Sequence, residues 1–353
     1  MTTDVVPVFD PSRLSMARVL AGLGKSDLGR AIDRSGGTVT QYELGQTVPT
    51  AETLQRCARA LGVQVGFFAA GRPRLRLDTT DIHFRTTSGA ASRLRWMAGV
   101  ELLWELIDQV GRVVELPPVD VGLALGVRHG DPITTAHLLR KAWGLDSGPV
   151  VHLLRQLETR GVFARLLPHR DQSGGSFSSA PHGLPIIVLA DDDAVERRFR
   201  TAHEVGHLLL HPEPAPGNAR HEAEADSFAE EFLMPASEIL DLVPGKADVK
   251  ALRDVAAGYG VSPAALLRRT NSAGIHSTTA MRKIMADIVV EAGEPTRSAY
   301  PGERPELLAQ AVAFAGQLGL PTSRLAAELR VTPTLLRELL NLPDTRPRLS
   351  VVS

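Results

Sequence analysis

The sequence of 353 residues contains a single cysteine, Cys57, so no disulfide can form within the chain. Aromatic residues make up only 5% of it, which predicts cores built mainly from aliphatic side chains. Long apolar runs are absent too, since a clean run such as residues 184–190 is far shorter than the roughly 20 residues that span a bilayer. The net charge of −1 argues against wholesale coating of nucleic acid, although it leaves room for a local basic patch.

The compartment can also be inferred from what is missing. The first residues include an acidic one, Asp4, and lack the basic segment that precedes the apolar part of a signal peptide. A lone thiol suits a reducing compartment, and Cys57 lies in an apolar helical pattern that favours a buried, structural thiol over a reactive one. We therefore expect a cytoplasmic protein with no membrane association.

The length of the chain, together with the glycine and proline residues that interrupt its helical segments, predicts several domains. We expect four parts, which are residues 1–71 (short helices broken by glycines), 72–130 (a basic linker and a helical connector), 131–290 (a larger domain) and 291–353 (a helical tail). The fold class predicted is mainly α with a small β-sheet near residues 162–190, that is, α+β.

The strongest chemical signal is the pentapeptide HEVGH at residues 203–207. Residues four apart on a helix differ by about 40° in direction and about 6 Å in height, so His203 and His207 would share one face. Two imidazoles so placed can bind one Zn²⁺, and Glu204 beside them can take a proton from metal-bound water. The pattern also occurs by chance, so it needs support from elsewhere in the chain.

Support comes from an acidic helix that follows within twenty residues. Glu222 and Asp226 are one turn apart and share a face, so Glu222 could be the third metal ligand. Asp226 could then accept the free N–H of a ligand histidine and fix its tautomer. The alternative is that these acids form a solvated helical face, as acidic runs usually do.

Two further histidines are close in the sequence but less suited as ligands. His211 repeats the spacing of four, yet along a continuous helix it lies about 12 Å from His203, too far to share an ion. We expect His211 to cap the helix end or face solvent, and His221 to lie on the surface.

Segments 198–211 and 222–235 together resemble the ImmA/IrrE family of bacterial zinc metallopeptidases, and the resemblance extends over about residues 131–290. It implies a minimal gluzincin domain of the zincin type, with His203, His207 and Glu222 as zinc ligands and Glu204 as general base. Members typically cleave a helix-turn-helix repressor and so switch on stress or mobile-element genes. At residue 226 this chain has Asp, whereas many members carry Asn. In related zincins Asp is the commoner residue at this position.

Residues 14–68 are similar to the all-α XRE-type helix-turn-helix of phage and plasmid repressors. The matching segments are 21–24, 27–32, 39–45 and 54–63. Apolar side chains would pack the small helices together, namely Leu28, Ile32, Val39 and Leu54. The resemblance implies that the helix starting near Ser35 enters the DNA major groove.

Two departures from that family concern DNA reading. The usual Gln at the start of the second helix is absent, and a glycine pair at residues 36–37 stands where base-contacting side chains would project. The remaining candidates for contact with double-stranded DNA are Arg34, Thr38, Thr40 and Gln41. Residues 1–76 hold ten Lys or Arg against six Asp or Glu, only mildly favourable to DNA, so a retained protein-interaction or autoinhibitory module is the alternative.

The leading hypothesis is a cytoplasmic zinc-dependent endopeptidase, of the gluzincin type, fused to a helix-turn-helix domain. Its protein substrate would be a repressor or an antitoxin. The competing hypotheses are a DNA-binding transcription regulator, or an antitoxin, in which the zinc domain is a sensing or interaction scaffold. The helix-turn-helix rhythm of residues 318–339 is common in helix pairs, so we expect that region to be structural.

Overall fold

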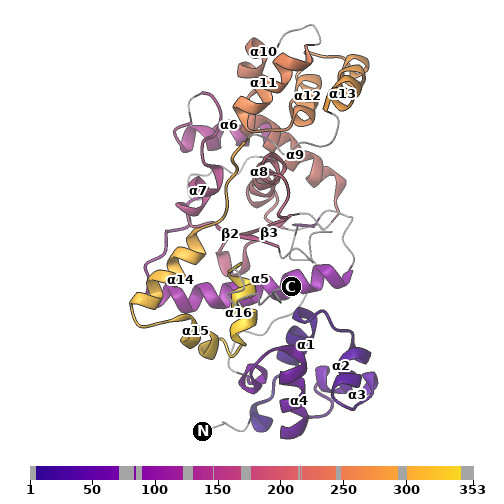
Figure 1. Ribbon diagram of the computed structural model, residues 1–353, viewed down its shortest axis with the longest axis vertical. Coiled ribbons are helices and arrows are strands. Elements are labelled where there is room, and N and C mark those ends of the chain that lie inside the picture. Colours follow the sequence, from indigo (N-terminus) through magenta and orange to yellow (C-terminus); the bar gives the residue numbers. More distant parts are fainter. Residues whose placement is uncertain are drawn as a thin grey trace, which may run out of the picture. The chain divides into compact units, whose positions relative to one another are not determined.

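The computed structural model describes residues 5–70, 83–84, 90–121, 130–145, 147–167, 176–213, 215, 217–243, 248–292 and 300–342. It is mainly helical with one small sheet, which confirms the fold class expected from the sequence (Figure 1). Among the described helices, none combines the length and the apolar character needed to cross a membrane.

The chain forms two compact units. The first contains the described residues within 1–79, 89–116 and 308–353, and the second those within 80–88 and 117–307. The domain boundaries placed by sequence at residues 71, 130 and 290 remain a prediction, because compactness alone does not show which segments fold independently.

Within the described residues of the first unit, every regular element is a helix. Its elements are η1 (Val6–Val8), α1 (Pro11–Leu20), α2 (Lys25–Ala31), α3 (Gly36–Glu43), α4 (Ala51–Leu61), η2 (Val65–Phe68), α5 (Ala90–Gly111), nearly all of α14 (Leu307–Gln317), α15 (Thr322–Glu328) and α16 (Pro333–Leu339). The four apolar side chains expected to pack its small helices are all buried, as predicted: Leu28, Ile32, Val39 and Leu54.

Helices α2 and α3 form the helix-turn-helix, and two local features shape the turn between them. Ser35 caps α3, because its side chain accepts a hydrogen bond from the Thr38 amide at 3.0 Å. Gly29 allows the turn to fold back on α2, since a Cβ there would lie 2.7 Å from the Arg34 carbonyl oxygen. Helix α3 forms across Gly36 despite the low helix propensity of the glycine pair.

Segments distant in the sequence complete this unit. From α5, the buried Glu105 pairs with the buried Arg13 of α1. From the chain's last part, Thr332 Oγ1 donates to the Gly62 carbonyl at 2.8 Å, and Arg330 Nη1 donates to the Gly66 carbonyl at 2.7 Å. The helix-turn-helix is therefore the N-terminal part of a larger helical unit.

The second unit combines the sheet with the remaining helices. Its strands are β1 (His83–Phe84), β2 (Phe163–Leu166), β3 (Phe177–Ser179) and β4 (Ile186–Leu189), and its other elements are α6 (Pro132–Ala142), α7 (Leu153–Glu158), η4 (Pro181–Gly183), α8 (Ala194–Leu210), α9 (Ala219–Leu233), α10 (Ala236–Leu242), α11 (Val249–Tyr259), α12 (Pro263–Ser272) and α13 (Thr278–Ala292). The strand order is β1-β3-β4-β2; only the β2–β4 pair is parallel, with Phe163 opposite Ile186.

Helices α8 and α9 form the centre of the second unit. Apolar side chains three and four apart on both helices enter one core with the sheet, among them Ala202, Val205, Phe228 and Phe232. Gly206 of α8 sets the distance between the helices, because a Cβ there would lie 3.2 Å from the Ala225 Cα and 3.0 Å from the Phe228 ring. The side chains that project from the two helices can therefore meet at short range.

Ion pairs hold α8 near its N-terminus and α9 near its C-terminus. Arg198 of α8 donates to the Val150 carbonyl and pairs with Glu303 at 3.5 Å. The carboxylate of Glu303 also accepts the amide hydrogens of the first two residues of α7, at 2.9 and 2.8 Å. In α9, the buried Glu231 pairs with Arg269 of α12. These pairs hold α8 and α9 in a defined position within the unit.

Candidate metal centre

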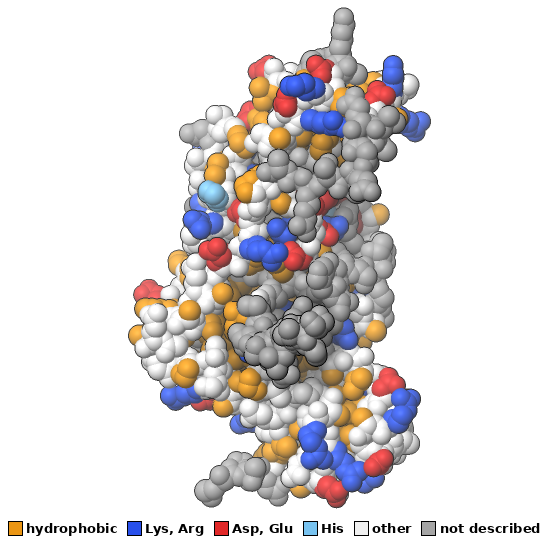
Figure 2. All heavy atoms as spheres, viewed as in Figure 1, with side chains coloured by type: hydrophobic (Ala, Val, Ile, Leu, Met, Phe, Trp, Pro, Cys, Tyr) orange, Lys and Arg blue, Asp and Glu red, His pale blue; other side chains and the backbone are white. Residues whose placement is uncertain are grey.

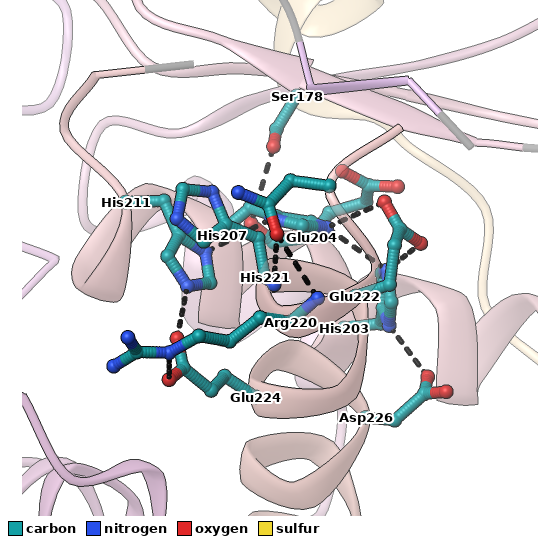
Figure 3. A network of polar contacts seen from close by, with 11 residues as sticks. Ser178, His203, Glu204, His207, His211, Arg220, His221, Glu222, Glu224 and Asp226 are labelled. Carbon is teal, nitrogen blue, oxygen red and sulfur yellow. Dashed lines mark hydrogen bonds and ion pairs between the residues drawn. The ribbon is translucent and has the colours of Figure 1, made fainter. Parts of the chain in front are cut away.

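The histidines of the HEVGH segment lie on one face of α8, as their spacing predicted. Asp193 caps the helix, its carboxylate accepting the Val195 amide at 3.1 Å. His203 and His207 are 3% and 2% exposed, and their Nε2 atoms lie 3.1 Å apart (Figure 3). Two buried imidazoles therefore direct their outer nitrogens at the same small region.

Helix α9 brings a carboxylate to that region. Asn218 caps α9, because its side chain accepts the Arg220 amide at 3.0 Å, and this places Glu222 in the first turn. One carboxylate oxygen of Glu222 lies 3.6 Å from His203 Nε2 and the other lies 3.6 Å from His207 Nε2. Within the described part of the chain, His203, His207 and Glu222 form a group whose ligand atoms all lie within 4.8 Å of one another.

The chemistry and spacing of these donors fit Zn²⁺. Zinc binds imidazole nitrogen and carboxylate oxygen at about 2.0–2.1 Å in a tetrahedron, so neighbouring ligand atoms lie about 3.3–3.4 Å apart. The two Nε2 atoms lie 3.1 Å apart, and each lies 3.6 Å from one oxygen of the Glu222 carboxylate, close to that value. Two histidines and one glutamate also leave the fourth position open, as catalytic zinc sites do.

Asp226 lies one turn beyond Glu222 and holds the inner nitrogen of His203. The Nδ1–Oδ1 distance is 2.7 Å, so the carboxylate can accept the Nδ1–H and turn Nε2 toward the region shared with His207 and Glu222. Burial lowers the pKa of His203, but its bonds to Asp226 and Glu222, with the nearby charge of Glu204, outweigh burial and raise that pKa to about 9. The surrounding carboxylates thus favour positive charge at this point, as a cation site requires.

Glu204 follows His203 on α8 and is only 2% exposed. Its backbone carbonyl accepts a hydrogen bond from Ser178 Oγ of β3 at 3.3 Å, which ties the helix to the sheet (Figure 3). Its charge is close enough to His203 to raise the pKa of that imidazole. A buried carboxylate that follows a candidate ligand histidine is a candidate general base for water.

One of the two alternatives expected for His211 is confirmed, because His211 is the C-cap of α8 and its amide donates to the His207 carbonyl at 3.0 Å. The other alternative, that its side chain faces solvent, is wrong. His211 is 5% exposed rather than solvated, and its Nδ1 lies 3.1 Å from His207 Nδ1. Its Nε2 lies 2.9 Å from the carboxylate of Glu224, and its ring stacks on His221 at 4.0 Å. Burial lowers the pKa of His211. The repeated spacing of four was the signal that placed His211 beside His207, but its burial depends on the docking of α9.

In the helix-turn-helix, the candidate DNA contacts differ in accessibility. Arg34 and Gln41 are exposed, whereas Thr38 and Thr40 are half-buried. The Thr40 hydroxyl donates to the Gly36 carbonyl at 3.1 Å, inside its own helix. On the face drawn in Figure 2, Lys and Arg side chains of this unit are mixed with Asp and Glu, in keeping with its modest net charge.

Two family models match the chain. Residues 158–271 match the IrrE N-terminal-like domain (Peptidase_M78), and residues 12–66 match a helix-turn-helix domain. The chain therefore combines these two domains in the order that the sequence predicted. The first match is narrower than the expected 131–290, but it includes all of α8 and α9. A search of curated proteins finds no significant match.

Proposed function

We propose that this chain is a zinc-dependent endopeptidase that cleaves a regulatory protein, with His203, His207 and Glu222 as the zinc ligands. The observation that carries the proposal is the convergence of these three residues, whose ligand atoms all lie within 4.8 Å of one another and whose two Nε2 atoms lie 3.1 Å apart. The match of residues 158–271 to the IrrE N-terminal-like domain supports it.

When bound, zinc would supply Lewis acidity, polarising the scissile carbonyl and lowering the pKa of a bound water. Glu204 accepts the proton of the attacking water and then delivers it to the leaving amine, so that one carboxylate serves both half-reactions. Asp226 accepts the Nδ1–H of His203, so Nε2 is the nitrogen of that ring that faces the metal region and would bind the ion.

The substrate that we propose is a helix-turn-helix repressor or an antitoxin, whose removal would switch on stress or mobile-element genes. The resemblance to the ImmA/IrrE family and the helix-turn-helix domain in the same chain favour this class. Such a substrate acts on the genome, and the reaction would then take place in the cytoplasm.

Elemental analysis of the purified chain tests the site first. We expect one zinc per chain, and none in the double variant His203→Ala/His207→Ala. Glu204→Gln should keep the zinc but no longer cleave a co-encoded repressor. Mass spectrometry of the reaction products measures that cleavage. A wild-type chain that stays free of zinc after reconstitution would refute the proposal.

The second candidate function is DNA binding by a transcription regulator, favoured by the helix-turn-helix match and by the exposure of Arg34 and Gln41. A mobility-shift assay on the upstream region of the gene tests it, with Arg34→Ala/Gln41→Ala as the variant expected to lose binding. Binding that survives in Glu204→Gln, without cleavage of any co-encoded repressor, would make the zinc domain a scaffold. Co-purification with a neighbouring gene product would instead point to an antitoxin.

A further inference from the structure

His211 is the second member of a line of polar contacts that starts at the candidate metal ligand His207 and continues to Glu224 and Arg220. The two Nδ1 atoms lie 3.1 Å apart, and His211 Nε2 lies 2.9 Å from Glu224 Oε2 (Figure 3). Arg220 donates from Nε to the other oxygen of Glu224 at 2.7 Å. Both ring nitrogens of His211 thus have a partner, one on α8 and one on α9.

The carboxylate decides the direction of these hydrogen bonds. Glu224 is paired with the guanidinium of Arg220, so it is ionised and can only accept. His211 must then carry its proton on Nε2, and in the neutral ring Nδ1 is left as an acceptor. The hydrogen between the two Nδ1 atoms therefore belongs to His207, whose Nε2 keeps its lone pair.

We propose that His211 is a positioning residue for His207. It accepts the Nδ1–H of His207 while Glu224 accepts the Nε2–H of His211, and the Nε2 of His207 then faces the metal without a proton. The inference rests on the proposed function for its metal, but not for its hydrogen-bond direction. His203 is held by a carboxylate directly, through Asp226, whereas His207 is held by a carboxylate through a second imidazole.

The opposite direction is unfavourable at two places. If His211 donated from Nδ1 as a neutral ring, its Nε2 lone pair would face an ionised carboxylate at 2.9 Å. His207 would then carry its proton on Nε2, which points at His203 Nε2 and Glu222 and could no longer bind an ion. The geometry therefore prepares the metal-binding tautomer before any metal arrives.

Two measurements test this on the full-length chain. Long-range ¹H–¹⁵N NMR of the metal-free protein reports which nitrogen of each histidine is protonated, with His211→Leu and His207→Ala used for assignment. Chelator competition gives the zinc dissociation constant. We expect His207 protonated on Nδ1, His211 on Nε2, and a zinc dissociation constant about 10–100-fold higher in His211→Leu.

Three further variants separate positioning from folding. His211→Asn keeps an amide oxygen that can accept from His207, so it should bind zinc more tightly than His211→Leu. Glu224→Gln can donate as well as accept, so it should give a mixture of His207 tautomers. His152→Asn makes the same change at an exposed histidine and should leave the zinc affinity unchanged. Thermal melting of each metal-free variant controls for folding.

The outcomes distinguish the two proposals. A proton on Nδ1 of His211, or a His211→Leu variant that is folded and binds zinc as tightly as the wild type, overturns the positioning role and leaves the peptidase proposal intact. A wild-type chain with the expected tautomers that binds no zinc overturns the peptidase proposal alone, because the hydrogen-bond direction is read in the metal-free protein.

Discussion

The ion pair between Arg13 and Glu105 should be the most sensitive point of the first unit. Arg13 of α1 is fully buried and Glu105 of α5 is 7% exposed. Their side chains meet through two contacts, at 2.5 and 3.3 Å, and the guanidinium also donates to the Phe67 carbonyl and lies 4.1 Å above the Phe67 ring. Glu105→Leu removes the counter-charge and leaves the cation in an apolar environment.

The size of the effect follows from that burial. Removing one member of a buried ion pair costs about 3–5 kcal/mol, because the remaining charge keeps its desolvation cost without compensation. With a urea dependence of about 1–3 kcal/mol per molar, a loss of about 4 kcal/mol lowers the unfolding midpoint by about 2 M. Replacing both members by apolar residues removes charge and counter-charge together, so Arg13→Met/Glu105→Leu should lie close to the parent.

The tryptophans provide the assay. Trp96 and Trp104 lie on α5 in the first unit, and Trp143 lies in the second, so the background variant Trp143→Phe restricts the fluorescence to the first unit. Urea titrations of the parent, Glu105→Leu and the double variant then give three midpoints. Unfolding of Glu105→Leu at the parent's midpoint, or a double variant as unstable as the single one, would show that the buried charge carries no such cost.

Three other predictions concern single side chains. Asp226→Asn should raise the zinc dissociation constant about 10–100-fold, because the carboxylate that orients His203 is lost; equal affinity by chelator competition would contradict this role. Gly206→Ala should destabilise the chain by about 1–3 kcal/mol and weaken zinc binding by forcing α8 and α9 apart. Its control is Gly258→Ala on α11, where a Cβ meets nothing within 4 Å, and urea midpoints that fall equally in both would refute the packing argument. Burial raises the pKa of Cys57 to about 11. Only about one thiol in a thousand is therefore ionised at pH 8, and an aromatic disulfide reagent should label Cys57 only after denaturation; rapid labelling of the native chain would contradict its burial.

Much of the candidate centre follows from spacing alone. A separation of four residues puts His203 and His207 on one helical face whatever the tertiary fold, and the same rule relates Glu222 to Asp226. That the two helices meet with Glu222 opposite the histidines depends on close packing at Gly206, which no periodicity specifies. Local patterns thus predict which residues share a face, and tertiary packing decides which faces come together.

The burial of His211 also depends on tertiary packing that local sequence patterns do not predict. Its position four residues after His207 was visible in the sequence, but a residue at the end of a helix is exposed unless another element covers it. The cover is α9, whose Glu224 and His221 contact the ring. Neither contact follows from helical periodicity, because both depend on the loop that returns the chain between α8 and α9.

The order of segments along the chain has a consequence for the DNA-binding hypothesis. The first unit is built from three separate segments of the chain, so the helix-turn-helix match at 12–66 covers only part of it. A fragment ending near residue 71 would lack Glu105, the partner of the buried Arg13, and Thr332, whose side chain bonds to Gly62. Leaving the buried Arg13 without its partner costs about 3–5 kcal/mol, which is comparable to the whole free energy of unfolding of a small, marginally stable domain. Failure of that fragment to bind DNA would therefore report unfolding, and only the full chain can decide whether Arg34 and Gln41 read a sequence.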